Sequence, residues 1–207
     1  MKLIQGEIYH VYNRGNNKQR IFYTNEHYYF FLEKVRRYIV PYCEILAYSL
    51  LPNHFHFLIT PNEKTNIPFT RDVETAIDIK TNGISMSQFS HGFQMLLSSY
   101  AKAINKRHKR TGSLFTQNTK AKRTSSDAFT MDYSLWCFIY IHNNPVVAGL
   151  ASSPSAWAFS SCKEYAGKST NPICNLKLGK KLLSLEMNEL IAFDDCQIPD
   201  HIIDQIF

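Results

Sequence analysis

Hydrophobic and polar residues alternate, or recur at helical spacing, along most of the chain. Residues 8–13, 45–51 and 54–60 are rich in β-branched and aromatic residues, which favours strands. Pro52 and Asn53 separate the last two segments and are typical of a tight hairpin turn. We therefore expect one isolated strand followed, after an interval, by a two-stranded hairpin.

Longer segments have the spacing of helices, and capping residues or prolines mark their ends. The expected helices cover about 24–40, 85–107 and 125–144. Pro41 should stop the first helix and Pro145 the third, because the residue before a proline avoids the helical region. Short strands are expected across residues 114–123, between the second and third helices.

The resulting order, β-α-β-β-α-β-α, predicts an α+β fold with a mainly antiparallel sheet. With 207 residues and 44% hydrophobic content, the chain can form one well-cored domain. We place that domain at residues 1–170 and a C-terminal extension with an acidic end at 171–207. Residues 61–83 are polar and interrupted by prolines, which predicts a long surface loop, a feature that compact domains tend to keep for function.

The sequence does not indicate a membrane protein or a secreted protein. No apolar stretch approaches the length of a membrane helix, and the first residues lack a signal-peptide core. The five cysteines form no Cys-x-x-Cys pair, so neither a zinc ribbon nor a disulfide framework is indicated. We expect a soluble, cytoplasmic protein without a membrane partner.

The net charge of +6 is unevenly distributed. Residues 182–207 contain six acidic and no basic side chains, so residues 1–181 carry 23 basic against 11 acidic residues, a net +12. Residues 102–123 hold eight Lys or Arg and no acid. A solvated helix face normally mixes charges, because like charges at helical spacing repel. The one-sign stretch therefore favours a polyanionic partner, and nucleic acid above all, over an ordinary basic surface.

His54 and His56 flank Phe55 on the second hairpin strand. Because side chains alternate across a strand, the two imidazoles share one face and can converge on one divalent ion. Phe55 and Phe57 would anchor the opposite face. By itself the pair is also compatible with two surface histidines, and a metal site needs a third ligand.

Tyr140 and Asn144 lie four residues apart and so share one face of the third helix. Asn144 could complete the protein ligands of a metal, with the Tyr140 hydroxyl near a bound phosphate. The alternative is a core stripe at helical spacing formed by Tyr133, Trp136, Cys137 and Tyr140, and spacing alone slightly favours this interpretation.

An ordered set of motifs resembles the small single-tyrosine, His-hydrophobe-His transposases of bacterial insertion sequences, and especially the REP-associated tyrosine transposases. The motifs are YHVYNRG at 9–15, LPNHFHFL at 51–58, Tyr100 with residues 105–115, YIHNNPVVAGL at 140–150, and Trp157 with Ser160, Ser161 and Tyr165. The chain departs from the family at Val147, where arginine is common, and at residues 118–120, where an Arg-Phe-Lys run is frequent.

The resemblance implies a ferredoxin-like sandwich whose helices pack on an antiparallel sheet. It also implies cleavage and rejoining of single-stranded or hairpin DNA through a 5′-phosphotyrosine, with Mg²⁺ or Mn²⁺. On this basis Tyr140 is the nucleophile, and His54, His56 and Asn144 are the metal ligands. The protein would be associated with the nucleoid, and the resemblance leaves both a monomer and a homodimer open.

DNA contacts are expected mainly from the basic stretch. The candidate residues are Arg14, Tyr100, Asn105, Lys106, Arg107, Lys109, Arg110, Lys120, Lys122 and Arg123. Tyr100 is a rival nucleophile, but the residue four positions later, Ile104, offers no ligand. The alternatives to a transposase are a DNA- or RNA-binding regulator that does not cut and a nickase of the replication-initiator type.

Overall fold

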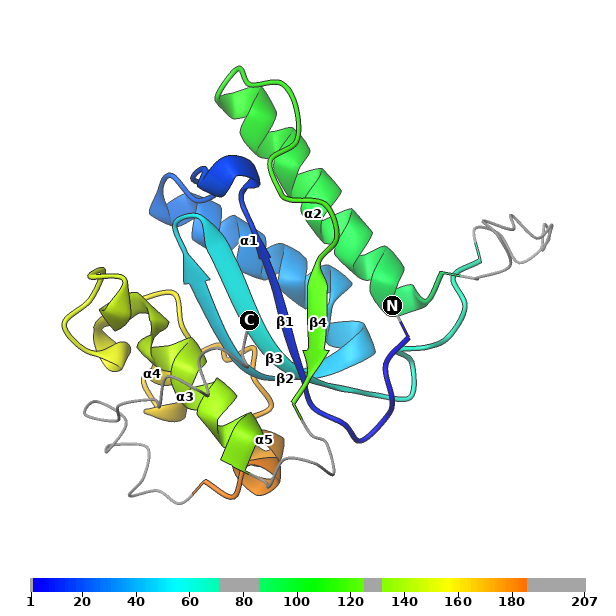
Figure 1. Ribbon diagram of the computed structural model, residues 1–207, viewed down its shortest axis with the longest axis vertical. Coiled ribbons are helices and arrows are strands. Elements are labelled where there is room, and N and C mark those ends of the chain that lie inside the picture. The colour runs from blue at the N-terminus through cyan, green and yellow to red at the C-terminus, as the bar shows by residue number, and fades with distance from the viewer. Residues whose placement is uncertain (1, 71–85, 125–131, 186–207) are drawn as a thin grey trace.

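A four-stranded antiparallel sheet forms the centre of the protein in a computed structural model, which describes residues 2–70, 86–124 and 132–185 (Figure 1). The strands are β1 (Tyr9–Arg14), β2 (Cys43–Leu51), β3 (His54–Pro61) and β4 (Lys120–Arg123), in the spatial order β2-β3-β1-β4. The helices α1 (Asn25–Tyr38) and α2 (Gln88–Arg107) complete a β-α-β-β-α-β unit. This is the split β-α-β arrangement of ferredoxin-like folds, so the predicted fold class is confirmed.

Each face of the sheet has its own hydrophobic cluster. Phe55, Phe57 and Ile59 of β3 pack on the side of α1 and α2, together with residues such as Phe31 and Leu96. Leu46, Leu58 and Ile8 pack on the other side against α3 (Asp132–Val147). The sheet therefore carries two helices on one face and α3 on the other.

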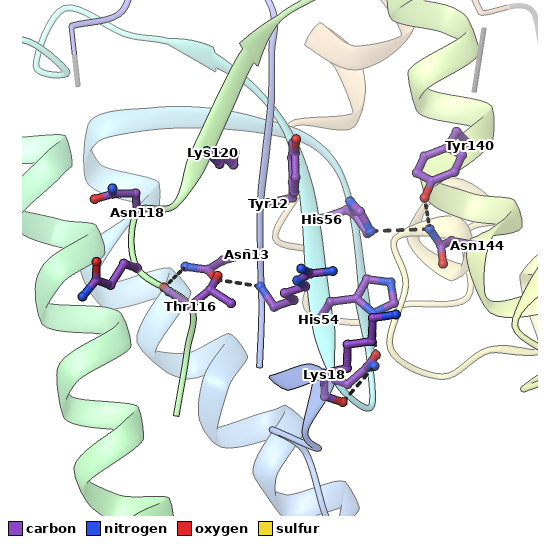
Figure 2. A pocket seen from close by; sticks show the side chains of 13 residues that line it. Tyr12, Asn13, Lys18, His54, His56, Thr116, Asn118, Lys120, Tyr140 and Asn144 are labelled. Carbon is purple, nitrogen blue, oxygen red and sulfur yellow. Dashed lines mark hydrogen bonds between the residues drawn. The ribbon is translucent and has the colours of Figure 1, made fainter. Parts of the chain in front are cut away.

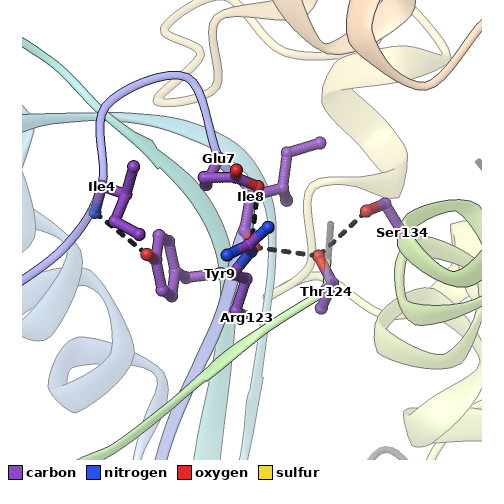
Figure 3. Close-up of polar contacts among 7 residues, drawn as sticks. All are labelled: Ile4, Glu7, Ile8, Tyr9, Arg123, Thr124 and Ser134. Atoms are coloured by element: carbon purple, nitrogen blue, oxygen red, sulfur yellow. Dashed lines mark hydrogen bonds and ion pairs between the residues drawn. The ribbon is translucent and has the colours of Figure 1, made fainter. Parts of the chain in front are cut away.

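The end of β4 is connected to the start of α3 by a polar contact (Figure 3). Thr124 Oγ1 donates to the Ile8 carbonyl oxygen at 3.1 Å and lies 2.9 Å from Ser134 Oγ. The expected cap of this helix, residues 125–127, lies outside the described residues. The Thr124 contact holds α3 against the sheet at its N-terminal end.

The prediction that Pro145 ends the third helix is wrong, because α3 continues to Val147. The proline removes only one backbone donor, and Gly149 provides the actual stop with a left-handed φ of 67°. The Gly149 and Leu150 amides donate to the carbonyl oxygens of Val146 and Pro145, which is the Schellman pattern. Asn144 consequently sits inside a regular helical turn rather than at a fraying end.

The free edge of β2 is covered by the segment that follows α3 in the chain, which contains the short elements η3 (Pro154–Ala156), α4 (Cys162–Tyr165) and α5 (Leu176–Leu182). Two further short elements, η1 (Asn16–Lys18) and η2 (Val40–Tyr42), lie after β1 and before β2. Leu50 N–H donates to the Phe159 carbonyl, and Ser161 N–H donates to the Tyr48 carbonyl. The buried Glu164 carboxylate accepts hydrogen bonds from the Tyr48 hydroxyl and from the Ile173 and Cys174 amides. Covering the edge in this way prevents it from pairing with another chain.

Several expected segments are shorter than predicted or are not described. Strand structure across 114–123 is limited to β4, apart from a single bridge between Phe115 and Gly15. The expected loop at 61–83 is described only in part. Its first residue, Pro61, belongs to β3, turns follow, and residues 71–85 are not described. The acidic end also lies outside the described residues, which stop at 185.

Gly92 determines how closely α1 and α2 approach. A Cβ at this position would overlap the carbonyl oxygen of Tyr38. We expect Gly92→Ala to lower the free energy of unfolding by about 1–3 kcal/mol, because the helices must separate despite the better helix propensity of alanine. Urea denaturation measures the effect. Ser98→Ala, at an exposed position of the same helix, is the control and should be neutral or slightly stabilising. Equal stability of the two variants would contradict the close-contact argument.

Candidate active site

The β2–β3 hairpin holds the histidine pair at a fixed position. The carbonyl oxygen of Pro52 accepts from the Ile21 and Phe22 amides, and that of Asn53 accepts from the Gly15 amide at 2.7 Å. His54 pairs in register with Arg14, and His56 pairs with Tyr12. Both imidazoles lie on the sheet face that α3 covers, and Phe55 and Phe57 pack on the opposite face, as the alternation predicts.

The last turns of α3 bring Tyr140 and Asn144 over this pair (Figure 2). Asn144 Nδ2 donates to the Tyr140 hydroxyl at 2.6 Å and lies 3.4 Å from His56 Nε2. The rings of Tyr140 and His56 meet edge to face, with centroids 5.6 Å apart. The structure therefore brings together all four residues that the sequence assigned to the metal and the nucleophile.

Burial keeps the two imidazoles neutral. It lowers the pKa of His56 well below the ordinary value, and the neighbouring His10 and His54 lower this pKa further. Burial also lowers the pKa of His54, although a hydrogen bond with Asn144 raises it. A neutral imidazole has a lone pair available, which a metal ion requires. Both histidines are therefore in the protonation state of a ligand at neutral pH.

The Tyr140 hydroxyl is protonated in its resting state. Burial raises the pKa of Tyr140, and the hydrogen bond from Asn144 lowers it in part. An amide N–H that donates to the phenol oxygen favours the charged form. Asn144 thus stabilises the phenolate that a nucleophilic attack requires, in surroundings that otherwise disfavour it.

The ring nitrogens are oriented in a way that fits a divalent cation. His54 Nδ1 lies 2.6 Å from Asn53 Oδ1, and since an amide oxygen only accepts, Nδ1 carries the hydrogen and Nε2 the lone pair. The described residues contain no group of three or more His, Cys, Asp or Glu that could bind a metal. A cation here would have two imidazoles and the Asn144 amide oxygen as protein ligands, which leaves positions open for phosphate oxygens.

A cavity of about 630 Å³ opens in front of these residues. Its other walls come from β1, the loop before β4 and the turn after β1. The lining residues are Tyr12, Asn13, Arg14, Lys18, Asn53, His54, His56, Thr116, Gln117, Asn118, Lys120, Tyr140 and Asn144. Three are cationic and none of these described lining residues is acidic, so the cavity favours an anion.

Asn13 fixes the loop that forms the far wall of the cavity. Its Nδ2 donates to the Thr116 carbonyl and to Thr119 Oγ1, and its Oδ1 accepts from Thr116 Oγ1 at 2.7 Å. This network holds Asn118 in a left-handed conformation, with φ at 62°. The polar wall opposite Tyr140 is therefore rigidly supported from β1.

The basic residues predicted to contact DNA divide into three groups. Arg14 and Lys120 line the cavity, and Lys122 points to the same sheet face, since it pairs with His10 in register. Lys106, Arg107 and Lys109 are exposed at the C-terminal end of α2. Asn105 and Arg110 hydrogen-bond within the chain instead. Asn105 donates to the Gly112 carbonyl, and Arg110 donates to Asn105 and Gln19.

Two of the residues predicted to contact DNA, Tyr100 and Arg123, lie away from the cavity and bind other parts of the chain. Tyr100 has no exposed surface, and its hydroxyl donates to the Ile21 carbonyl at 2.8 Å. The prediction that it contacts DNA is therefore wrong, and the same burial excludes it as a rival nucleophile. Arg123 pairs in register with Tyr9, on the face away from the cavity, and its Nε lies 3.1 Å from Glu7 Oε2 (Figure 3).

Sequence reasoning missed His10, Tyr12 and Lys18. His10 and Tyr12 precede the turn at Gly15 on β1 and share a face with the histidine pair, which the alternation of residues 8–13 could have revealed. Lys18 lies in η1, and no periodic signal could place it at the cavity. His142, within the matched motif, is buried against Ser161 at 2.7 Å, and burial lowers its pKa to about 3.

Comparisons with known proteins agree with this architecture. No protein-family model and no curated protein sequence matches the chain. Among solved structures, the chain is similar to a REP-associated tyrosine transposase bound to a REP hairpin, with a TM-score of 0.55 and 20% sequence identity. The match covers 84% of this chain and 87% of the other. At this identity the likeness establishes the shared fold.

Metal binding can be tested at the histidine pair. His54→Ala should abolish Mn²⁺ binding measured by isothermal titration calorimetry and leave the fold intact, because His54 is only half-buried. His56→Ala should also abolish binding, but at a stability cost of about 1–3 kcal/mol, since the buried ring is hydrogen-bonded to His10. His108→Ala, at the exposed end of α2, should bind Mn²⁺ normally. Normal binding by His54→Ala would place the ion elsewhere.

The exposed cations at the end of α2 should contribute to DNA affinity. Replacing Lys106, Arg107 and Lys109 by alanine should weaken the salt dependence of single-strand binding. The slope of log K against log salt concentration should become less negative by up to about 0.7 per lost phosphate contact. Fluorescence anisotropy across a salt series measures the slope. The control variant replaces Lys168, Lys177 and Lys181 by alanine. These lysines are exposed in the C-terminal part of the described chain, and their replacement removes the same amount of charge. Equal changes in both variants would mean that net charge, rather than a contact surface, controls binding.

Proposed function

We propose that the protein cuts and rejoins single-stranded or hairpin DNA, with Tyr140 as the nucleophile. His54, His56 and Asn144 would bind Mg²⁺ or Mn²⁺ beside it. The observation that carries the proposal is the single contact network from the Tyr140 hydroxyl through Asn144 to His56, inside a cavity with a cationic rim. The solved structure with the same fold is a tyrosine transposase bound to a hairpin, which agrees with this substrate class.

The cavity would hold a phosphodiester between Tyr140 and the cationic rim. Arg14, Lys18 and Lys120 offer donors to the phosphate oxygens on either side of the scissile bond. A divalent cation at the histidine pair would withdraw charge from a phosphate oxygen and orient the phosphodiester. The neutral imidazoles and amide add no negative charge that would weaken this effect.

The reaction begins with attack of the Tyr140 oxygen on phosphorus. A bond forms between that oxygen and phosphorus, and the bond from phosphorus to the 3′ oxygen breaks. The Tyr140 hydroxyl loses its proton and the released 3′ oxygen takes one up, so the products are a 5′-phosphotyrosine and a free 3′-hydroxyl. An ordinary tyrosine is only about 10⁻³ phenolate at pH 7, and burial of Tyr140 lowers this fraction. The hydrogen bond from Asn144 offsets part of that penalty, so Asn144 has a role in activating the nucleophile as well as in binding.

A covalent intermediate conserves the energy of the phosphodiester. A second 3′-hydroxyl can therefore attack the phosphotyrosine, release Tyr140 and join a different strand without ATP. This reversibility distinguishes a strand-transferase from a hydrolytic nuclease. It agrees with a cavity that has a tyrosine hydroxyl in its lining.

A covalent adduct is the sharpest test. Hairpin oligonucleotides with single-stranded flanks and a label on the 3′ portion should migrate with the protein on a denaturing gel in the presence of Mn²⁺. Tyr140→Phe keeps the ring packing and removes one hydroxyl, so it should lose the adduct at a stability cost near 1 kcal/mol, on the order of one hydrogen bond. Peptide mapping should place the nucleotide on Tyr140.

Two tyrosines serve as matched controls. Tyr12→Phe removes the other phenol that lines the cavity, and Tyr133→Phe removes a hydroxyl from the same helix. Both variants should still form the adduct. If the adduct still forms with Tyr140→Phe and disappears with Tyr12→Phe, the nucleophile is Tyr12 on β1. Absence of an adduct with every single-stranded substrate would favour the alternative of a DNA- or RNA-binding protein that does not cut.

A further inference from the structure

His10 contacts His56 on the sheet face that α3 covers and, unlike His56, does not line the cavity. Its Nε2 lies 2.8 Å from His56 Nδ1, and both side chains are 1% exposed. The two rings are nearly parallel, with an interplanar angle of 18°. The ring of Tyr12 stacks on His10 at 4.7 Å, and Tyr140 meets it edge-on at 6.3 Å. The His10 ring is therefore fixed in position by its neighbours.

The contacts around His56 determine where its hydrogen lies. Asn144 Nδ2 is an amide donor that lies 3.4 Å from His56 Nε2, so Nε2 accepts and carries no hydrogen. A neutral His56 then carries its hydrogen on Nδ1 and donates it to His10 Nε2. His10 must in turn carry its own hydrogen on Nδ1. One proton arrangement thus satisfies both sides of His56.

This arrangement suits a metal ligand. A ligating histidine binds through one nitrogen and donates through the other, and the second partner sets the tautomer and the ring orientation. The partner is most often a carboxylate or a backbone carbonyl. Here it is a neutral imidazole, which fixes the ring without placing a negative charge next to the phosphate site.

We propose that His10 is a positioning residue that accepts a hydrogen bond from His56 Nδ1 and thereby keeps His56 Nε2 available for a divalent cation. The proposal rests on the metal role of the histidine pair in the proposed function, but it does not depend on DNA cleavage. The alternative is that His10 only fills space in the sheet face under α3. The two explanations predict different effects of a substitution that keeps a hydrogen-bond acceptor at this position: only a positioning role predicts that the metal affinity is retained.

Two substitutions separate these readings. His10→Gln can place an amide oxygen where Nε2 lies and keeps the acceptor, whereas His10→Phe keeps a planar ring and removes it. The affinity for Mn²⁺ alone, measured by titration calorimetry, should fall about 10- to 100-fold in His10→Phe. His10→Gln should retain most of the wild-type affinity. Equal losses in both variants, or no loss in His10→Phe, would overturn the proposal.

The tautomer can be observed directly in the unaltered protein. Long-range ¹H–¹⁵N spectra of ¹⁵N-histidine-labelled protein, without metal, should show His56 protonated at Nδ1 and unprotonated at Nε2. A hydrogen on His56 Nε2 would overturn the proposal even if His10→Phe does not fold. The outcomes are separable from those of the proposed function. A protein that binds Mn²⁺ through the pair but forms no adduct contradicts DNA cleavage and leaves the role of His10 intact.

Discussion

The two-residue period of β3 is the constraint on which the structure depends. Phe55 and Phe57 must be buried under α1 and α2, so His54 and His56 can only project to the other face. On that face Ile8, Leu46 and Leu58 pack against α3, and the same helix brings Tyr140 and Asn144 to the two histidines. Folding and site assembly therefore follow from the same alternation, and a shift of one residue in register would destroy both.

Support for the site comes from segments that are far apart in the sequence. Asn13 connects β1 to the loop before β4, and Glu164 connects the edge of β2 to the C-terminal part of the described chain. These contacts use backbone groups and buried polar side chains with several partners each. A buried polar group with all its partners specifies one arrangement, because any alternative would leave it unsatisfied.

Much of the fold and of the candidate site could be predicted from the sequence, because these features depend on the two-residue repeat of strands and the 3.6-residue repeat of helices. The strand and helix order, the shared face of His54 and His56, and the spacing of Tyr140 and Asn144 follow from alternation and from the helical repeat. Residues 100–110 show where local reasoning stops. Tyr100 and Arg110 both belong to a basic, aromatic stretch, but one is in the core and the other bonds to Gln19, 91 positions earlier. Burial and long-range partners are tertiary properties, and no charge pattern encodes them.

The absence of carboxylates among the described residues that line the cavity has a consequence for the order in which ligands would bind. Sites built from carboxylates repel a phosphate until a cation has neutralised them, so metal must bind before the nucleic acid. None of the described residues lining this cavity is acidic, and its imidazoles are uncharged. In the proposed reaction, DNA and cation would therefore be able to bind in either order. Phosphate oxygens of bound DNA would complete the ligands of the ion, so the site would hold the metal more tightly with substrate than without it.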